Sequence, residues 1–295
     1  MLKKHGTRLV SLLFAFALVF TSVAVAPSDV FAAINNHRAQ TINVRNATVS
    51  RAMLYKYKRK KIKNANKIPV LTYHRILANN VKRTPTYVND RYAITVKEFN
   101  QQMKWLRKKR YRAITCDELY LWRMGKLKLP KRSVLITIDD GHGASVENAI
   151  PVLRKYKLRA TVFVIGKLSY ESNGSYYIKH SRIKEIQRIY PNIINFQSHT
   201  YNLHRQNAYQ TESYQSVMAD AAQQRSLYGF EYLAYPHGGC SDNMIRAYKN
   251  GGIKMAFLFG KPGKGYATRK QNVYKMKRFE VPANMKLKKF KKICK

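Results

Sequence analysis

The middle of the chain alternates short apolar runs with longer segments in which apolar residues recur every three or four positions. Runs rich in β-branched and aromatic residues predict strands at residues 68–74, 112–115, 133–138, 159–165, 192–197, 231–236 and 255–259. Amphipathic segments between them predict helices at residues 95–111, 116–126, 146–156, 181–190, 214–229 and 241–252, and a segment at 273–282 closes the series. Such regular alternation is typical of βα units, so the sequence predicts an α/β fold with a parallel sheet.

Two of the predicted helices begin with a capping signal. Thr95 is followed three residues later by Glu98, and Thr115 is followed in the same way by Glu118. In a capping box the threonine hydroxyl accepts a hydrogen bond from the third helical N–H, and the glutamate accepts one from the threonine N–H. We therefore expect both helices to begin directly after the threonine.

The first 32 residues have the form of a secretory signal. Basic residues in the first eight positions precede an apolar stretch from Leu9 to about Ala26, and a small-residue cleavage site ends at Ala32. We expect residues 1–32 to be a signal peptide and the remaining chain to be secreted and extracellular, associated with the cell wall or the membrane. The alternative is a retained membrane anchor, because the apolar stretch approaches spanning length.

Two basic segments flank a single predicted domain at residues 68–285. Residues 33–67 predict a basic linker, and residues 286–295 predict a basic C-terminal tail. The whole chain has 56 Lys and Arg against 15 Asp and Glu, a formal net charge of +41 that attracts polyanions. Because the chain is expected to be exported, we predict that these arms bind an anionic wall polymer or a membrane surface, and we expect no nucleic acid partner. The alternative is that both arms are merely solvated.

Polar clusters follow three of the predicted strands. Asp139 and Asp140 come directly after the strand at 133–138, residues 198–204 follow the strand at 192–197, and residues 235–239 end the strand at 231–236. The carboxyl ends of parallel strands share one face of a barrel or open sheet, and such folds build their sites there. We therefore expect the three clusters to meet.

Two histidines and one carboxylate in these clusters form a metal-ligand set. Asp140, His199 and His204 together make a two-His, one-carboxylate site, which leaves positions open for water and substrate on Zn²⁺, Fe²⁺, Co²⁺ or a similar ion. The second carboxylate, Asp139, lies beside this set without needing to bind the metal. That is the position of a general base.

The three clusters resemble the motifs of the polysaccharide deacetylases that carry a NodB-type chitooligosaccharide deacetylase domain, carbohydrate esterase family 4. The matching stretches are TIDDG at 137–141, HTYNLH at 199–204 and AYPHGG at 234–239. The spacing of the two histidines is closer to the poly-N-acetylglucosamine deacetylase branch, as are the flanking segments PVLTYHRI at 69–76 and MKRFEVP at 276–282. The resemblance implies a distorted (β/α) barrel and a secreted, metal-dependent hydrolase. Its substrate would be the N-acetyl groups of N-acetylglucosamine residues in a cell-wall or extracellular polysaccharide.

The resemblance also implies roles for single residues. Asp139 would be the catalytic base, and Asp140, His199 and His204 would bind a divalent metal. Zinc is the expected metal, with cobalt, nickel, iron and manganese as alternatives.

The third motif implies the rest of the site. Its residues Tyr235, Pro236 and His237 would form a wall of the substrate groove. The main-chain amide of His237 would bind the oxyanion, which places His237 among the catalytic residues. Tyr73, Tyr201 and Tyr235 are candidates for stacking on sugar rings.

Two departures from the family pattern affect proton transfer. The third motif lacks the arginine that braces the base aspartate in many members, because Ala234 and Tyr235 stand in that region. The late Leu-x-His motif, which often supplies the general acid, is absent because no histidine follows His237. The proton donor to the leaving amine therefore stays open among Asp139, His237 and His142.

Two other classes of function compete with a hydrolase. A non-catalytic module that binds glycan or cell wall would keep the fold, and the two departures favour it slightly, but both aspartates and both histidines are retained. A secreted cationic binder of nucleic acid or lipid would need only the basic arms, and it would leave the three clusters without a role.

Overall fold

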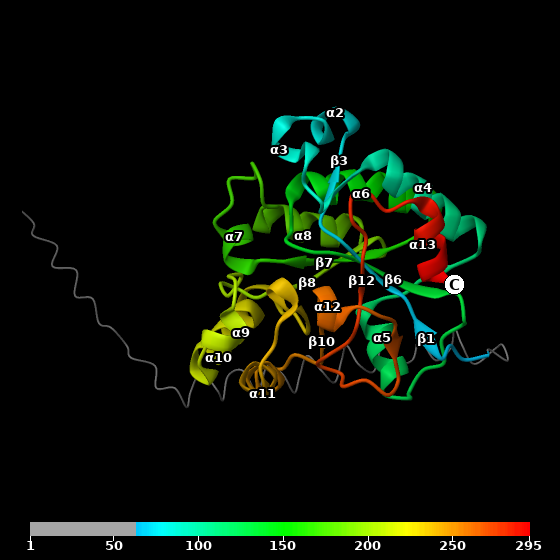
Figure 1. The fold of residues 1–295 in the computed structure, drawn as a ribbon. Helices are drawn as coiled ribbons and strands as arrows, with labels where there is room; N and C mark the ends of the chain where they lie inside the picture. The colour runs from blue at the N-terminus through cyan, green and yellow to red at the C-terminus, as the bar shows by residue number, and fades with distance from the viewer. Residues whose placement is uncertain (1–62) are drawn as a thin grey trace, which may run out of the picture. The chain divides into compact units, whose positions relative to one another are not determined.

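Eight parallel strands form the central sheet of residues 63–295, the part of the chain that this computed structural model describes (Figure 1). The strand order is β10–β9–β8–β7–β6–β2–β12, and β5 pairs with the first residues of β6. The bounds are β2 Val70–Tyr73, β5 Arg112–Ala113, β6 Ser133–Ile138, β7 Ala160–Val164, β8 Ile194–Ser198, β9 Tyr232–Ala234, β10 Met255–Phe257 and β12 Phe279–Glu280. The predicted α/β fold with a parallel sheet is confirmed.

The sheet curls because one segment near the C-terminus contacts both of its edges. Met276 forms a parallel bridge with Phe257 of β10, and three residues later β12 begins and pairs with β2 at the opposite side of the sheet. The N–H of Leu258 donates to the carbonyl of Met276, and the N–H of Val281 donates to that of Thr72. The result is the distorted barrel that the sequence predicted.

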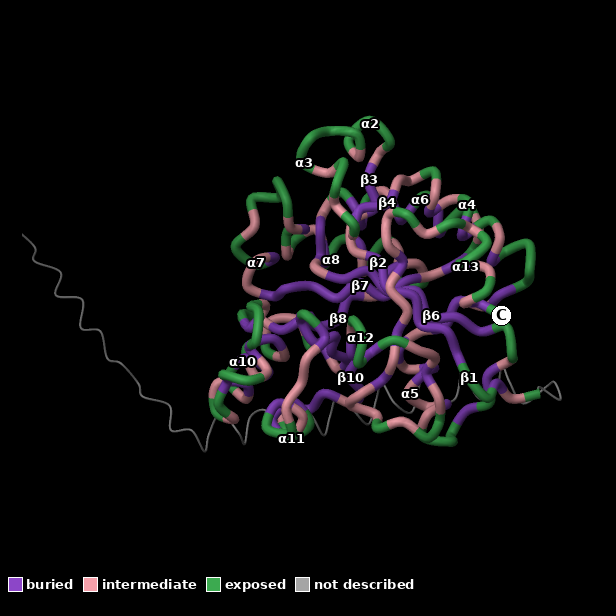
Figure 2. Tube along the Cα trace, in the orientation of Figure 1, coloured by how far each residue is buried: buried purple, intermediate pink, exposed green. Residues whose placement is uncertain are grey.

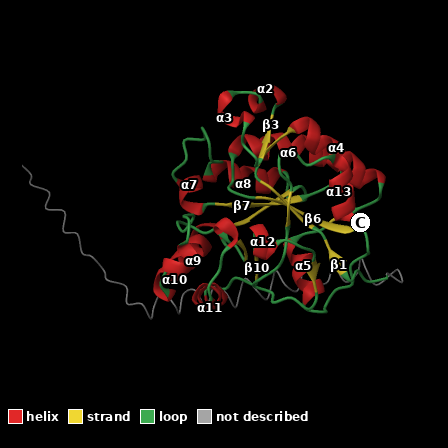
Figure 3. Ribbon diagram, viewed as in Figure 1, coloured by secondary structure: helices red, strands yellow, loops and turns green. Residues whose placement is uncertain are grey.

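Helices lie around the outside of the curled sheet (Figure 3). Their bounds are α2 Asn79–Lys82, α3 Pro85–Val88, α4 Val96–Lys108, α5 Cys116–Arg123, α6 Gly143–Tyr156, α7 Gly166–Tyr170, α8 His180–Ile189, α9 Ala208–Thr211, α10 Tyr214–Tyr228, α11 Asp242–Asn250, α12 Gly260–Gly263 and α13 Leu287–Cys294, with a 3-10 turn η1 at Pro236–Gly238. Both predicted capping boxes are present, at Thr95 with Glu98 and at Thr115 with Glu118. Within residues 63–295, no helix is both long and apolar enough to cross a bilayer.

Two small sheets add to the main one. Strand β1, Lys67–Ile68, pairs antiparallel with β11, Ala267–Thr268. Strand β3, Arg75–Leu77, pairs parallel with β4, Ala93–Thr95. The β3–β4 pair continues the chain directly from β2, so it positions the residues that follow Tyr73 beside the catalytic end of the sheet.

The hydrophobic core lies between the sheet and the surrounding helices. Every residue of β6 and β7 is buried, as Figure 2 shows for the middle of the molecule. Such near-continuous burial is expected of strands that are covered on both faces. The strand ends are thereby held by a rigid body, which fixes the position of the polar residues that follow them.

The last ten residues differ from the basic tail expected at 286–295. Residues Leu287–Cys294 form helix α13, with Phe290 and Cys294 buried against the core. The ring of Phe290 meets that of Trp105 at 6.0 Å between centroids. The lysines face outward while the apolar residues face the core, so the segment that was expected to be a basic tail is an amphipathic helix. The predicted signal peptide and most of the basic linker, residues 1–62, lie outside the described residues.

Candidate metal and catalytic site

The three polar clusters meet at the carboxyl ends of the strands. Asp139 and Asp140 follow β6, His199 follows β8, and His237 lies in η1 directly after β9. The ring centroids of His199 and His204 are 4.9 Å apart, as are those of His204 and His237. The convergence predicted from the shared face of the strand ends is therefore present.

Asp140, His199 and His204 bring three potential ligand atoms together. The Nε2 atoms of both histidines lie 3.4 Å from Oδ1 of Asp140, and the three atoms lie within 4.8 Å of one another. Nδ1 of His199 is 2.7 Å from the carbonyl oxygen of Ala234. Donation from Nδ1–H to that carbonyl leaves the lone pair of Nε2 directed at the site, an arrangement typical of metal-binding histidines.

This spacing fits a divalent metal. Bonds of about 2.1 Å from a tetrahedral ion place its ligand atoms about 3.4 Å apart. The imidazole and carboxylate donors suit zinc and its neighbours in the first transition series. The described residues therefore contain a set that can hold such an ion, and it is the set that the sequence predicted.

The backbone of the site adopts left-handed conformations at three motif residues that are not glycine. Asp140 has φ 72°, Thr200 has φ 69° and His237 has φ 53°. Left-handed backbone is unfavourable for such residues, and it persists where the surrounding structure enforces it, often at functional sites. Gly238 has φ 82°, and a Cβ there would lie 2.2 Å from the carbonyl oxygen of Phe259. That close approach explains why glycine follows His237.

Asp139 is buried and pairs with an arginine from the last part of the domain. Its two oxygens accept hydrogen bonds from Nη1 and Nη2 of Arg278, each at 2.8 Å. Arg278 is 2% exposed, and its Nε donates to the carbonyl of Leu258 at 2.9 Å. The arginine that the third motif lacks is therefore supplied by Arg278, which precedes β12. The sequence contained the signal, since Arg278 lies in the segment MKRFEVP.

The arginine decides the charge of Asp139. Burial alone would raise the pKa of this carboxyl, but the guanidinium of Arg278 and the ring of His199 outweigh it and hold the pKa below its usual value. Burial alone would raise the pKa of Asp140, but its close interactions with the rings of His199 and His204 outweigh burial and lower the pKa well below its usual value. Both carboxyls are thus ionised at neutral pH, as a base and a metal ligand require.

His74 is a site residue that the sequence interpretation did not single out. It follows β2, the strand next to β6, and its ring is held between Tyr92 and Phe259 at 4.8 and 5.1 Å between centroids. Burial lowers its pKa, while the charges of Asp140 and Asp139 act to raise it. Among the hydrogen bonds of the described residues, none engages either ring nitrogen of His74. The segment PVLTYHRI carried the signal, but only the pairing of β2 with β6 places its histidine at the site.

The two histidines considered as proton donors differ in their surroundings. His142 is buried, its Nδ1 lies 2.7 Å from Oγ of Ser145, and burial lowers its pKa to about 4. This histidine is fixed as part of the start of α6. His237 is exposed at the site, and across the described residues its backbone N–H has no protein acceptor. That free N–H suits the oxyanion role.

Two tyrosines proposed to stack on sugars are buried instead. Tyr73 is 1% exposed, and its hydroxyl donates to Gln102 at 2.7 Å. Tyr235 is fully buried and packs edge-on against Tyr248 at 6.2 Å between centroids. Tyr73 ends β2 and Tyr235 directly follows β9, and every residue of both strands is buried, so the expected sugar contacts of Tyr73 and Tyr235 are wrong. Pro236 is also buried, which leaves His237 as the exposed residue of the expected groove wall.

A buried carboxylate outside the motifs holds the loop between the two metal-binding histidines. Asp220 of α10 accepts hydrogen bonds from the N–H groups of Tyr201 and Asn202 at 2.9 and 2.7 Å. The hydroxyl of Tyr248 donates to the same carboxylate at 3.2 Å. Asp220 thus fixes the turn that brings His204 back towards His199, although it touches neither ring.

An arginine and a tyrosine line the mouth of the site. Nη1 of Arg75 lies 3.7 Å from Asp140 and 3.3 Å from the hydroxyl of Tyr176. Arg75 also pairs with Asp90. Tyr176 is 36% exposed, and its ring lies against that of His142. It therefore presents an aromatic face to solvent beside the metal-ligand set, as sugar-binding surfaces do.

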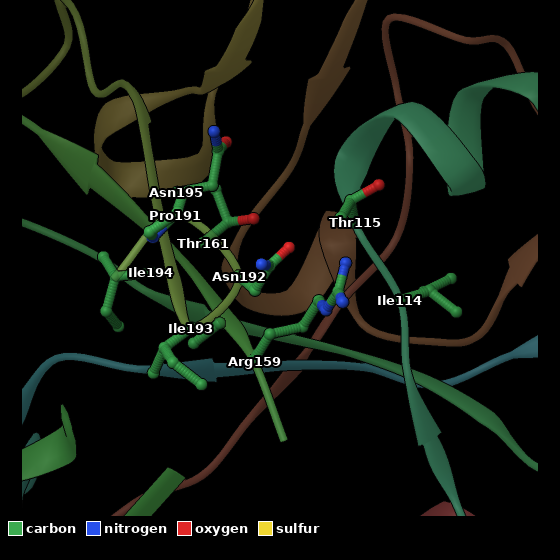
Figure 4. A pocket seen from close by; sticks show the side chains of 10 residues that line it. Ile114, Thr115, Arg159, Thr161, Pro191, Asn192, Ile193, Ile194 and Asn195 are labelled. Atoms are coloured by element: carbon green, nitrogen blue, oxygen red, sulfur yellow. The ribbon is translucent and has the colours of Figure 1, made fainter. Parts of the chain in front are cut away.

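The hollow in Figure 4 is separate from this site. It is lined by the first residues of β7 and β8, including Thr161 and Asn195, and by Arg159 and Asn192. These residues lie at the amino ends of the strands, opposite the catalytic end. Its volume of ≈ 20 Å³ has room for about one water molecule, so it cannot admit a sugar.

Sequence comparisons relate the chain to polysaccharide deacetylases. The model of the family described as polysaccharide deacetylase matches residues 126–256. YxkH of Bacillus subtilis (strain 168), named as a polysaccharide deacetylase, is 30% identical over 227 residues, which cover 74% of this chain and 73% of that protein. The poly-beta-1,6-N-acetyl-D-glucosamine N-deacetylase of Staphylococcus aureus (strain N315) is 29% identical over 217 residues, which cover 67% of this chain and 74% of that protein.

Solved structures share the fold. The deacetylase PplD of Streptococcus pyogenes, determined in complex with acetate, superposes with a TM-score of 0.68 at 21% identity, covering 79% of this chain and all of that one. IcaB from Ammonifex degensii superposes with a TM-score of 0.61 at 23% identity, covering 78% of this chain and 97% of that one. The curled parallel sheet is therefore shared with these deacetylase structures.

Proposed function

The chain belongs to the polysaccharide deacetylase family, and from that premise we propose that it removes N-acetyl groups from N-acetylglucosamine residues of a cell-wall or extracellular polysaccharide with the help of a divalent metal. One observation carries the proposal. Asp140, His199 and His204 converge as a ligand set, and the buried Asp139 lies beside them with its own arginine. A module that merely binds glycan has no need of a buried, ionised carboxylate next to a metal set.

Zinc is the metal that we propose, since the 3.4 Å separations match a tetrahedral ion, with cobalt, nickel, iron and manganese as alternatives. Asp140, His199 and His204 would hold it and leave a further position open. A divalent metal at such a site supplies Lewis acidity, which makes water a better nucleophile near neutral pH and draws charge from an amide carbonyl. Acetamides are poor electrophiles, so this contribution is what the reaction needs.

The chain's own residues then have three tasks. Asp139 accepts the proton of the attacking water, for which its ionised state is required. The free N–H of His237 donates to the oxyanion as the carbonyl carbon becomes tetrahedral. His74 receives the proton that Asp139 took from the water and delivers it to the sugar nitrogen, so that the C–N bond breaks and an amine and acetate leave. We assign the last task to His74 because its ring nitrogens are free and it lies next to both aspartates.

A staphylococcal relative is named for poly-β-1,6-N-acetylglucosamine, which supports this polymer as the substrate class. The exposed ring of Tyr176 and the half-buried ring of Tyr201 are the aromatic candidates for contact with it. We further propose that the protein is secreted and acts at the cell wall or membrane, because residues 1–32 have the form of a signal peptide. The basic arms would hold it there.

Acetate release tests the proposal. Wild-type protein, loaded with zinc and measured for metal content, is compared with Asp139→Asn and His74→Gln on poly-N-acetylglucosamine and on peptidoglycan. Both variants should keep the metal and lose acetate release by at least the hundredfold that positioned acid or base groups contribute. Asp242→Asn, which changes a carboxyl that is 98% exposed, is the matched control and should act as wild type.

Two outcomes would contradict the proposal. Equal rates of acetate release for wild type and Asp139→Asn would show that Asp139 is not the catalytic base. A wild-type protein that holds metal and polymer yet releases no acetate would favour the non-catalytic binding module.

A further inference from the structure

The end of the domain opposite the catalytic site contains a hollow surrounded by lysines. Its lining includes Lys67, Lys131 and Lys295, together with Tyr266 and Cys294, and its volume is ≈ 190 Å³. That space is large enough for a phosphodiester group with several waters. The three lysines come from the strand before β2, the loop before β6 and the end of the chain, so the fold itself brings the charges together.

One of these lysines is held in place. The Nζ atom of Lys67 lies 3.9 Å from the centre of the Tyr266 ring, a cation–π contact that fixes the ammonium at the rim. None of the three lysines forms an ion pair within residues 63–295; the lysines that do are Lys167, Lys254 and Lys275. Among the described residues, no aspartate or glutamate side chain therefore pairs with the three lysines of the hollow.

The surroundings of the hollow are basic as well. The hydroxyl of Tyr111 donates to the carbonyl of Cys294, so the end of α4 lies beside the end of α13. Exposed basic side chains of these elements are Arg107, Lys108, Lys109, Arg110, Lys288, Lys289 and Lys292. The stretches 99–116, 119–138 and 281–295 contain no aspartate or glutamate. Asp117 and Glu118, which lie between two of these stretches, are bound to Tyr232 and Arg112, so basic side chains dominate this end of the domain.

The hollow and the catalytic site lie at opposite ends of the same strand. Lys131 precedes β6 and Asp139 follows it, and β6 spans 6 residues, about 20 Å of extended chain. A ligand in the hollow would leave the catalytic end of the sheet free. This separation distinguishes the basic end from the substrate groove.

We propose that this basic end docks on a flexible phosphate polymer, with Lys67, Lys131 and Lys295 binding one phosphate group in the hollow. A single polymer strand can enter a concave pocket, whereas a flat bilayer touches only its rim. The exposed large apolar residues of the described chain are Val81, Val88, Met124, Tyr170, Tyr176 and Ile189, and none belongs to α13 or to the lining of the hollow. The surface thus lacks the apolar side chains with which interfacial helices enter lipid.

Salt-dependent binding to poly(glycerol phosphate) tests this docking surface. The triple variant Lys67→Gln/Lys131→Gln/Lys295→Gln is compared with wild type by titration at several salt concentrations. Because the three lysines bind one phosphate group, the variant loses one phosphate contact, and the slope of log K against log salt should fall by about 0.7, the value per contact for a single-stranded polyanion. Acetate release from short soluble N-acetylglucosamine oligomers should not change, and an unchanged melting temperature shows that the variant folds.

A second triple variant distinguishes specific binding at the hollow from general attraction by the net positive charge. Lys97→Gln/Lys184→Gln/Lys249→Gln removes the same charge from exposed positions on α4, α8 and α11. It should keep the wild-type slope. An equal loss of slope in both variants would show non-specific attraction and overturn the proposal. Binding to vesicles of phosphatidylglycerol and phosphatidylcholine without binding to the polymer would overturn it as well, because the partner would then be a membrane.

Discussion

Replacing Arg278 with methionine is expected to leave Asp139 as a buried carboxylate without its guanidinium partner. In the wild type the two residues are joined by two hydrogen bonds of 2.8 Å, and the side chains of Arg278 and Asp139 are 1% and 2% exposed. Methionine has a similar length, so the volume inside the curled sheet is largely kept. The change therefore isolates the charge and the hydrogen bonds.

The expected cost follows from burial. Removing one partner of a buried ion pair destabilises a protein by about 3–5 kcal/mol, because the remaining charge stays desolvated. Asp139 can escape this cost by taking up a proton, and its pKa should then rise, since burial is the largest influence on it. The double variant Asp139→Asn/Arg278→Met removes both charges and should recover most of the lost stability without activity.

The pH dependence has a definite sign. In the wild type the lowered pKa of Asp139 contributes stability above the unfolded value of about 3.9, and this contribution is lost as the pH falls through the folded pKa. In Arg278→Met the raised pKa reverses the sign, so the stability deficit should be largest at neutral pH and shrink towards pH 4. The acid limb of kcat/KM should move to higher pH for the same reason.

Urea unfolding at pH 7 and pH 4 together with a pH profile of acetate release measures these effects. Arg182→Met, which breaks a surface pair with Glu147, is the matched control and should change stability by less than about 1 kcal/mol. An Arg278→Met protein with wild-type stability and an unmoved acid limb would refute the assignment of Arg278 as the partner of the base.

Three further predictions concern other parts of the domain. Asp220→Asn should weaken zinc binding about 10–100-fold by loosening the turn between the histidines, and excess zinc should restore acetate release, as followed in a metal titration. Gly238→Ala should lose activity and melt at lower temperature, since its Cβ would meet a backbone oxygen at 2.2 Å; a wild-type melting curve would contradict that. Phe290→Ala should destabilise the domain by about 3–5 kcal/mol in urea unfolding, whereas Lys288→Ala should have little effect; equal, small effects would indicate a solvated tail after all.

Local sequence patterns predicted the longer helices between α4 and α11, most strands of the main sheet and the metal set, whereas short elements such as β3, β4 and α7 were not predicted. The capping boxes at Thr95 and Thr115 are set by residues three apart, and strands such as β6 are visible as continuous apolar runs. The convergence of Asp140 and His199 followed from a general property of parallel strands, whose carboxyl ends share one edge. These inferences required no knowledge of which strands are neighbours.

The parts that were missed depend on strand order. Arg278 reaches Asp139 because the segment before β12 closes the barrel next to β2, and His74 reaches the site because β2 lies beside β6. Periodicity within a segment carries no information about either pairing. The buried Tyr235 shows the converse, since its position in a motif suggested contact with substrate, whereas its ring packs against Tyr248 in the core. The high lysine content of α13 suggested a basic tail, although the apolar residues of this segment are spaced as in an amphipathic helix.

The pairing of Asp139 with Arg278 has a consequence for how the protein is made. The two residues are separated by 139 positions, so a chain emerging from the ribosome carries the aspartate long before its guanidinium partner follows. Until that late segment closes the barrel, the Asp139 carboxylate has no guanidinium partner that would keep it ionised in a buried position. A polypeptide truncated before Arg278 would therefore contain the residues of all three motifs and still lack an ionised base.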